Sequence, residues 1–253
     1  MSLQGKNAIV TGGSRGIGKG IVLELASRGA NVLLTYQSSR SQADEVVERA
    51  RQSGVDAFAV VASGGDLSAP TTVVDAAVAR WGQVDIIVNN AGTREDYDFE
   101  AMTSDAWERQ FNANVRFPTF LIQAATRHFG PAPRIVNFSS SYAHDGHAGC
   151  LAYVGCKGAI ESLTRSLARE LGHKYNATVN CVCPGPVATE LWQQSLQDPE
   201  TAKEWDSIIK TTPAAPRVAE VDDIAQIVGF LSEERSRWIT GMVVNANGGL
   251  MFN

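Results

Sequence analysis

Short runs of apolar, β-branched residues alternate along the whole chain with longer amphipathic stretches. The runs are typical of strands and cover residues 7–11, 31–35, 57–61, 85–89, 134–139, 178–183 and 242–245. Between them, apolar residues recur with helical spacing, as in Ala43, Val46, Val47 and Ala50. Strands that alternate with helices favour a parallel sheet covered on both faces. We therefore predict a single α/β domain over residues 1–253, built as a doubly wound parallel sheet.

The bulk composition narrows the possible partners. The chain has 253 residues, of which 44% are hydrophobic and 19% charged, and such a chain is expected to fold by itself. A net charge of −5 gives no large positive field, so nucleic acid and anionic membranes are poor candidate partners. Apolar runs fall short of the roughly 20 residues of a membrane span, and a strand pattern starts at Asn7, so we expect a cytoplasmic protein.

Residues 186–216 are expected to form a lid or substrate loop.

The four cysteines, Cys150, Cys156, Cys181 and Cys183, are too few and too clustered for a disulfide framework. Cys181 and Cys183 alternate in an expected strand and have no partner at the spacing typical of zinc ligands. We therefore expect buried thiols and no metal site.

A glycine-rich turn follows the first expected strand, with a helical pattern directly after it. Glycines let the backbone approach a pyrophosphate, and the free N–H groups at a helix N-terminus bind anions. The alternative is a turn that merely packs a helix on a strand, but the position after the first strand favours a dinucleotide site. The expected cofactor contacts here are Gly12, Ser14, Arg15, Gly16, Ile17 and Gly18.

The end of the second expected strand indicates which dinucleotide binds. NAD enzymes carry an acidic residue there, about 20 positions after the glycine turn, but residues 35–40 of this chain contain none. A cofactor 2′-phosphate would instead meet hydroxyl groups and the cation of Arg15. We therefore predict NADP(H), with contacts from Tyr36 and Ser38, and leave open whether Arg40 takes part or is a solvated residue at a helix start.

Tyr153 and Lys157 are four residues apart, so on a helix the phenol and the ammonium would share one face. A free tyrosine has a pKa near ~10, and a neighbouring cation and a helix N-terminus both favour the phenolate. Ser140 follows an expected strand, where a parallel sheet presents its ligand site. Such a pair alone could also be an exposed helix pair.

The order of the remaining sequence pieces is highly specific in combination. Residues 89–92 read Asn-Asn-Ala-Gly after the fourth expected strand, and residues 184–189 read Pro-Gly-Pro-Val-Ala-Thr after the sixth. With the glycine turn, they make the chain resemble the short-chain dehydrogenase/reductase family over essentially its whole length. The resemblance implies a Rossmann-like fold and the catalytic tetrad Asn114, Ser140, Tyr153 and Lys157. It also implies cofactor contacts from Asp66, Leu67, Asn90, Ala91, Gly92, Tyr153, Lys157, Pro184, Gly185, Val187 and Thr189.

The resemblance further implies an NADP-dependent ketoreductase that acts on a small-molecule carbonyl or alcohol substrate as a homo-oligomer, a tetramer or a dimer. Residues 216–218 and 234–249 look similar to members from filamentous fungi that act in secondary metabolism, which points to a bulky substrate. One departure is the insertion Ser63-Gly64-Gly65 before Asp66, which puts the adenine contact of Asp66 in doubt. Two alternatives stay open: a non-catalytic dinucleotide-binding module, and a scaffold for epimerisation or cyclisation.

Overall fold

The computed structural model describes residues 1–197 and 199–252. In this part of the chain seven strands form one parallel sheet with the order β3-β2-β1-β4-β5-β6-β7. The strands are β1 (Asn7–Val10), β2 (Asn31–Tyr36), β3 (Ala57–Val61), β4 (Val84–Asn89), β5 (Phe129–Phe138), β6 (Thr178–Pro184) and β7 (Val243–Ala246). The strand order reverses between β1 and β4, and this reversal creates a crevice at the carboxyl ends of the strands. The predicted doubly wound α/β fold is confirmed.

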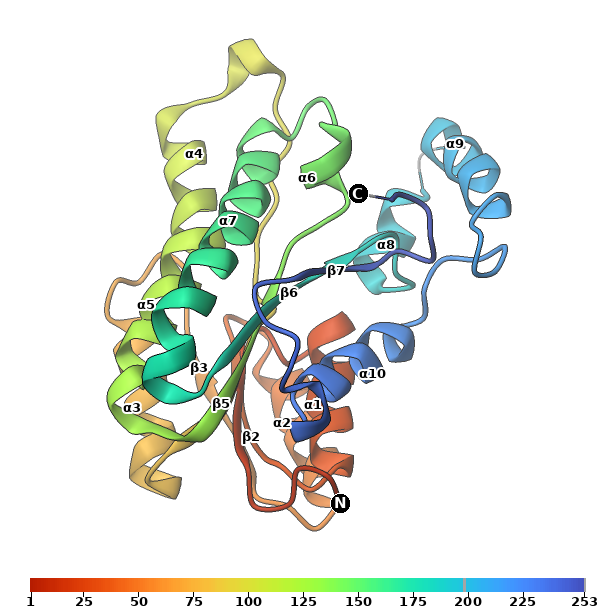
Figure 1. Cartoon of the computed structure of the whole chain (residues 1–253). Coiled ribbons are helices and arrows are strands. Elements are labelled where there is room, and N and C mark those ends of the chain that lie inside the picture. The colour runs from red at the N-terminus through yellow and green to blue at the C-terminus, as the bar shows by residue number, and fades with distance from the viewer. Residues whose placement is uncertain (198, 253) are drawn as a thin grey trace.

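Helices cover both faces of the sheet (Figure 1). One face carries α1 (Gly16–Ser27), α2 (Arg40–Arg51) and α10 (Val221–Leu231), whose buried side chains join one hydrophobic cluster. The other face carries α3 (Ala69–Trp81), α5 (Phe117–Ala125) and α7 (Leu151–Tyr175), which share a second cluster. Apolar side chains alternate between the two clusters along the central strands, since Val10 and Val88 face one side while Ile9 and Ile87 face the other.

The remaining helices lie around these two layers. The helix α4 (Ser104–Phe111) packs beside α7 and leads through a π-helical turn at Asn112–Arg116 into α5. Three helices occupy the end of the molecule where the crevice opens, namely α6 (Tyr142–Asp145), α8 (Glu190–Ser195) and α9 (Pro199–Lys210). Single 3₁₀ turns lie at Phe99–Ala101, Thr126–His128 and Glu234–Ser236. Among the described residues, no helix combines the length and the apolar character that a membrane span requires.

Two local boundaries differ from what the sequence pattern suggests. Strand β5 begins at Phe129 rather than at residue 134. The run of apolar, β-branched residues does not extend to its first residues, because Gly130, Pro131 and Pro133 are poor strand formers. Gly172 does not end α7, which continues to Tyr175 with Asn176 as its C-cap at a φ of 54°. The extra turn is stabilised by Tyr175, whose ring packs edge-on against Phe129 with the centroids 5.4 Å apart.

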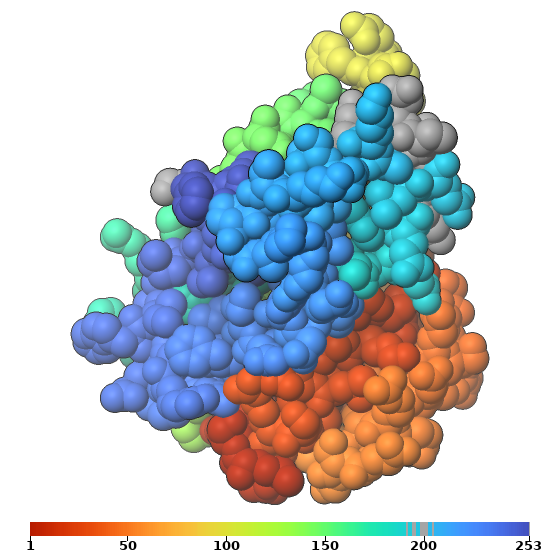
Figure 2. Space-filling view, turned by 90° about the vertical axis from the view of Figure 1, so that its right-hand side faces the viewer, coloured from red at the N-terminus to blue at the C-terminus, as the bar shows by residue number. Residues whose placement is uncertain are grey.

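The segment expected to be a lid, residues 186–216, contains α8 and α9 rather than an irregular loop. Residue 198, inside this segment, lies outside the described residues. The two helices touch through Trp192 and Trp205, whose ring centroids are 5.0 Å apart. Figure 2 shows this segment on the surface, above the N-terminal part of the chain.

Candidate active site

The glycine turn brings the backbone of β1 and α1 close together. Gly12 has a φ of 65° and Gly16 a φ of 53°, a region that favours glycine. A Cβ at Gly18 would lie 2.1 Å from the carbonyl oxygen of Gly12, so no larger residue fits there. Among the described side chains none caps the N-terminus of α1, and the first N–H groups of any helix lack a partner within the helix. This cradle fits the pyrophosphate of a dinucleotide.

A cavity of about 410 Å³ extends from this turn, within the size range of ligand sites. Residues that the sequence predicted as cofactor contacts make up much of its lining: Gly12, Ser14, Arg15, Gly16, Ile17, Gly18, Tyr36, Ser38, Asn90, Ala91, Gly92 and Thr189. The sequence reasoning missed several others: Thr35, Gln37, Ser39, Ala62, Gly64, Thr93, Ala113, Phe117 and Glu190. The cavity thus joins the end of β2 to the loops after β4 and β6.

Asn90 has a structural role in this cavity. Its Nδ2 donates to the carbonyl oxygens of Thr11 at 2.9 Å and Gly12 at 3.2 Å, and so fixes the loop after β4 to the glycine turn. The hydroxyl of Thr11 accepts from the backbone N–H of Ala91 at 3.0 Å. These bonds hold the walls of the cavity before any ligand binds.

The expected catalytic pair lies at the start of α7. Tyr153 is in the first turn, where the helix dipole favours negative charge, and Lys157 follows one turn later. The Nζ of Lys157 lies 5.4 Å from the centroid of the Tyr153 ring and donates to the carbonyl oxygen of Phe138, the last residue of β5, at 2.9 Å. Lys157 is buried, and a cation in such a place requires this kind of fixed partner.

Asn114 lies on the same side of the crevice, in the π-helical turn between α4 and α5. Its Nδ2 donates to the carbonyl oxygens of Thr93 at 2.8 Å and Gln110 at 2.9 Å, while its Oδ1 accepts from the N–H of Thr93 at 3.2 Å. A Cβ on Gly92 would approach Asn114 Oδ1 to 2.6 Å and Lys157 Nζ to 3.5 Å. Gly92, which lines the cavity, is therefore next to both Asn114 and Lys157, two residues of the expected tetrad.

Comparison with known proteins establishes the family. The family described as enoyl-(acyl carrier protein) reductase matches residues 12–251. The chain is also 52% identical to the short-chain dehydrogenase/reductase FrzI of a Cladobotryum species. The aligned region has 251 residues and covers 99% of this chain and 97% of FrzI. This chain belongs to the short-chain dehydrogenase/reductase family.

Other members of the family match over almost the full length. A hydroxynaphthalene reductase-like protein of the fungus Metarhizium robertsii is 36% identical over 264 residues, covering 98% of this chain and 96% of the relative. Among solved structures, a blue fluorescent protein from a metagenomic library, in complex with NADPH, superposes with a TM-score of 0.91 at 36% identity, covering 100% of both chains. The predicted likeness to fungal members of secondary metabolism is confirmed.

In this short-chain dehydrogenase/reductase, Ser140 lies in the loop between β5 and α6. Its Oγ accepts from the N–H of Tyr142 at 3.3 Å, and the N–H of Ser141 donates to the carbonyl oxygen of Pro184 at 3.1 Å. The loop is thereby tied to the end of β6. Ser139 is buried behind it and bonds to Glu161 of α7, with 2.5 Å between Ser139 Oγ and Glu161 Oε1.

Several residues expected to contact the cofactor do not line the cavity. Asp66 is among them, since its Oδ1 accepts from both the N–H and the hydroxyl of Ser68 at 2.8 Å, and these bonds hold the pKa of Asp66 below its usual range. Leu67 is 63% exposed. Their contact with adenine stays a prediction, as do cofactor contacts from Tyr153, Lys157, Pro184, Gly185 and Val187, which do not line this cavity either.

His144 and His147, two histidines near the loop of Ser140, both have specific partners. His144 Nε2 lies 2.8 Å from Glu161 Oε1, and the ring of His147 stacks on Tyr142 with the centroids 4.2 Å apart. The guanidinium of Arg94 lies 5.0 Å from the Tyr142 ring centroid. The sequence could not predict the contacts of His144 with Glu161 and of Arg94 with Tyr142, because these partners are far apart in the chain.

Proposed function

We propose that this short-chain dehydrogenase/reductase uses NADP(H) to interconvert a carbonyl and an alcohol on a bulky secondary metabolite. The observation that carries the proposal is the position of Gly92, which lines the cavity together with the glycine cradle and lies next to Asn114 and to Lys157, the partner of Tyr153. When bound, the cofactor supplies or accepts the hydride at its nicotinamide. The protein then has to bind the substrate oxygen and move one proton.

In the proposed mechanism, the hydroxyls of Ser140 and Tyr153 bind the carbonyl oxygen of the substrate. Tyr153 donates its proton to that oxygen as the general acid, and accepts it in the reverse direction. Lys157, fixed by the carbonyl oxygen of Phe138, holds its positive charge beside the Tyr153 ring and stabilises the phenolate that forms. Asn114 supports the water-linked route by which the proton is replaced.

The preference for NADP(H) is supported by the charges around the cavity. Tyr36, Gln37, Ser38 and Ser39 at the end of β2 line it without a carboxylate, and Arg15 lines it from the glycine turn. Glu190 is the acidic residue of the lining. It adjoins Thr189, whose methyl group would lie 3.5 Å from a Cβ built on Gly16. Glu190 is therefore next to the pyrophosphate end of the cavity and not at the end of β2, where the 2′-phosphate is expected. The NADPH complex of the related blue fluorescent protein agrees with this preference.

The substrate class is inferred from the relatives and from the segment 186–216. The reductase-like protein of Metarhizium is named for a hydroxynaphthalene, a fused aromatic substrate. In this chain α8 and α9 would close over the substrate, with the Trp192–Trp205 pair as an aromatic wall. We therefore propose a polycyclic ketone of the polyketide, terpenoid or alkaloid kind.

The test is to follow NADPH absorbance with a panel of ketones that runs from small aliphatic to fused aromatic compounds. The proposal expects oxidation of NADPH with the fused ketones and a much slower reaction with NADH. Conversion of a substrate without net NADPH oxidation would favour epimerisation or cyclisation. Tight NADPH binding with no turnover on any ketone, alcohol or isomerisable substrate would favour a non-catalytic binding module.

A further inference from the structure

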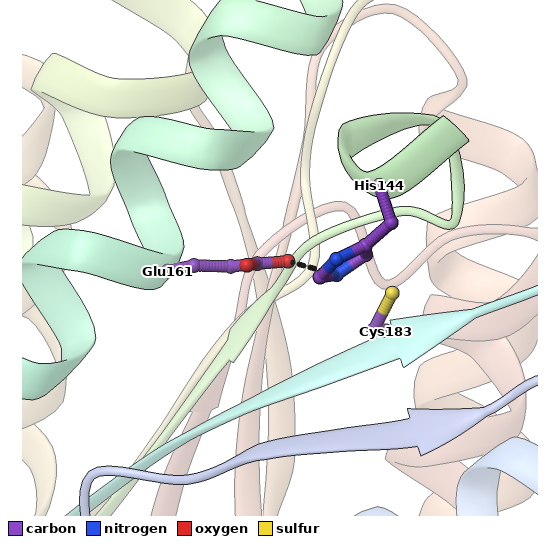
Figure 3. A group of neighbouring side chains, drawn as sticks. All are labelled: His144, Glu161 and Cys183. Atoms are coloured by element: carbon purple, nitrogen blue, oxygen red, sulfur yellow. Dashed lines mark ion pairs between the residues drawn. The ribbon is translucent and has the colours of Figure 1, made fainter. Parts of the chain in front are cut away.

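Three side chains that can bind a metal converge behind the loop of Ser140. His144 comes from α6, Glu161 from α7 and Cys183 from β6, and one ligand atom of each lies within 4.8 Å of the others. Figure 3 shows the imidazole of His144 between the carboxylate of Glu161 and the sulfur of Cys183. None of the three is used in the proposed mechanism.

We propose that His144, Glu161 and Cys183 form a site for a thiophilic divalent cation of the zinc class. Nitrogen, carboxylate oxygen and thiolate sulfur are all established zinc ligands, and three protein ligands with a water in the fourth position are a common arrangement. Glu161 and a Cys183 thiolate together carry two negative charges, which balance the two positive charges of the ion. His144 Nε2 and Glu161 Oε1 are 2.8 Å apart, and all three ligand atoms lie within 4.8 Å of one another, so an ion about 2.0–2.3 Å from each ligand would separate the first two slightly and draw the sulfur in.

The surroundings give this site both support and access. Glu161 and Cys183 are buried, whereas the His144 side chain is 22% exposed. A surface cavity of about 920 Å³ is lined by His144 and Glu161, and it would admit the ion and leave room for its water ligand. Arg165 lines the same cavity and contributes a positive charge to it.

Ser139 holds the carboxylate of Glu161 in place through the 2.5 Å contact of its hydroxyl. A bond of this kind, from a residue outside the ligand set, is what orients ligands at protein metal sites. The sequence alone predicted no metal site because the three residues are far apart in the chain and lack a recognisable spacing. The sheet and the loop after β5 bring them together.

Cys181 offers a matched control for Cys183. It lies two residues earlier on β6, on the same face of the strand, and both thiols are buried. Burial raises the pKa of each thiol to about 12. Cys181 is not part of the cluster, so the two cysteines share their environment and differ in whether His144 and Glu161 are within reach.

The experiment is a titration of the metal-free full-length protein with Co²⁺, a spectroscopic substitute for Zn²⁺, followed by competition with Zn²⁺. The proposal expects one ion per chain at micromolar concentration, with a thiolate-to-cobalt charge-transfer band that Zn²⁺ removes. Cys181→Ser should keep the band and Cys183→Ser should lose it. Loss of an outer-shell partner typically costs about 10–100-fold in metal affinity, so loss of the Cys183 ligand should cost more than about 100-fold.

A second measurement, the change in melting temperature on adding Zn²⁺, shows whether each variant is folded as well as whether it binds the ion. Zn²⁺ should raise the melting temperature of the wild type and of Cys181→Ser, and should leave that of Cys183→Ser and His144→Ala unchanged. Absence of the charge-transfer band in the wild type, an equal band in Cys183→Ser, or binding only at millimolar Co²⁺ would each overturn the proposal. These readouts do not depend on catalysis, so they separate the metal site from the proposed reductase activity.

Discussion

The Nζ of Lys157 lies 5.4 Å from the centroid of the Tyr153 ring, one helical turn further along α7. The ammonium is buried and is fixed by a carbonyl oxygen of β5, so its charge stays beside the phenol whether or not a ligand is present. A fixed charge of this kind costs no reorganisation when negative charge develops on the tyrosine. Replacing Tyr153 and replacing Lys157 should therefore have different effects on kcat and on NADPH affinity.

Tyr153→Phe should lower kcat for carbonyl reduction by roughly 10²- to 10⁴-fold, because general acid catalysis is typically worth that much. The ring packing and the cofactor cavity stay in place, so the dissociation constant for NADPH should change little. Single-turnover kinetics and NADPH fluorescence titration measure the two quantities. If the variant keeps more than about a tenth of wild-type turnover while chemistry limits the rate, Tyr153 is not the general acid.

Lys157→Ala provides the comparison. It removes the cation beside Tyr153 and, on the role that the family resemblance assigns to Lys157, a contact to the nicotinamide ribose. We therefore expect both a lower kcat and weaker NADPH binding, measured by the same two assays. Unchanged NADPH affinity would rule out the ribose contact.

Arg15→Ala should weaken NADPH binding by about 10- to 100-fold, since hydrogen bonds to charged groups are worth roughly 1.5–3 kcal/mol. NADH binding should change little because NADH lacks the 2′-phosphate. Arg40→Ala is the control: Arg40 is exposed and pairs with Asp44 at 3.7 Å, and Arg15 lines the cavity whereas Arg40 does not. Isothermal titration with both cofactors measures the effect, and equal losses for NADPH and NADH would contradict the assignment.

We expect the protein to assemble into a tetramer or a dimer. Trp238, Met242 and Phe252 near β7 are 95%, 53% and 83% exposed, and Phe120 on α5 is 40% exposed. Exposed apolar groups of this kind mark interaction surfaces, which agrees with the oligomer that the family resemblance implies. Sedimentation velocity at micromolar concentration should show an oligomer, and Phe120→Glu should shift it to smaller species. A single species near the chain mass of 27.1 kDa would refute the expectation.

The stability should depend on pH through Glu233, which joins the N-terminus to the loop after α10. Burial acts to raise the pKa of Glu233, but hydrogen bonds from Ser2, Arg235 and Arg28 outweigh burial and hold the pKa below its usual range. A lowered pKa in the folded state stabilises the protein above the pKa of the unfolded state, about 4.3, and this stabilisation is lost as the pH falls further.

Glu233→Gln should therefore cost about 1.5–3 kcal/mol at neutral pH, as for a hydrogen bond to a charged group. That corresponds to roughly 2–4 °C in melting temperature for each kcal/mol in a chain of this size. The difference from the wild type should shrink as the pH falls below about 4. Thermal unfolding at several pH values tests this, and a difference that does not change with pH would contradict the role of the carboxylate.

The sequence predicts the parts of this structure that local patterns encode. The seven strands, the glycine turn and the Tyr153–Lys157 face each depend on residues that are close in the chain. The sequence fails where a contact is made between distant segments, as for His144 with Glu161, or where a helix ends without a glycine, as at Asn176. The π-helical turn that holds Asn114 likewise has no sequence pattern that distinguishes it from an α-helix.

The last prediction concerns the insertion Ser63-Gly64-Gly65. The structure has no space for a side chain at Gly64 but has space for one at Gly65. A Cβ on Gly64 would lie 2.7 Å from the Cα and 2.6 Å from the Cβ of Ala113, whereas a Cβ on Gly65 meets only the Ser63 hydroxyl at 4.0 Å. Neither glycine has a positive φ, so the two positions differ in space rather than in backbone strain. Gly64 thus lets the loop after β3 pack against the residue next to Asn114.

Gly64→Ala should force this loop away from the π-helical turn at a cost of about 1–3 kcal/mol, typical of overpacking, and lower the melting temperature. It should also weaken NADPH binding, because Gly64 and Ala113 both line the cavity. Gly65→Ala should leave both quantities close to wild type. Thermal unfolding and NADPH titration of the two variants provide the comparison. Equal effects of the two substitutions would show that the inserted loop is positioned by its own chain flexibility and not by the contact with Ala113.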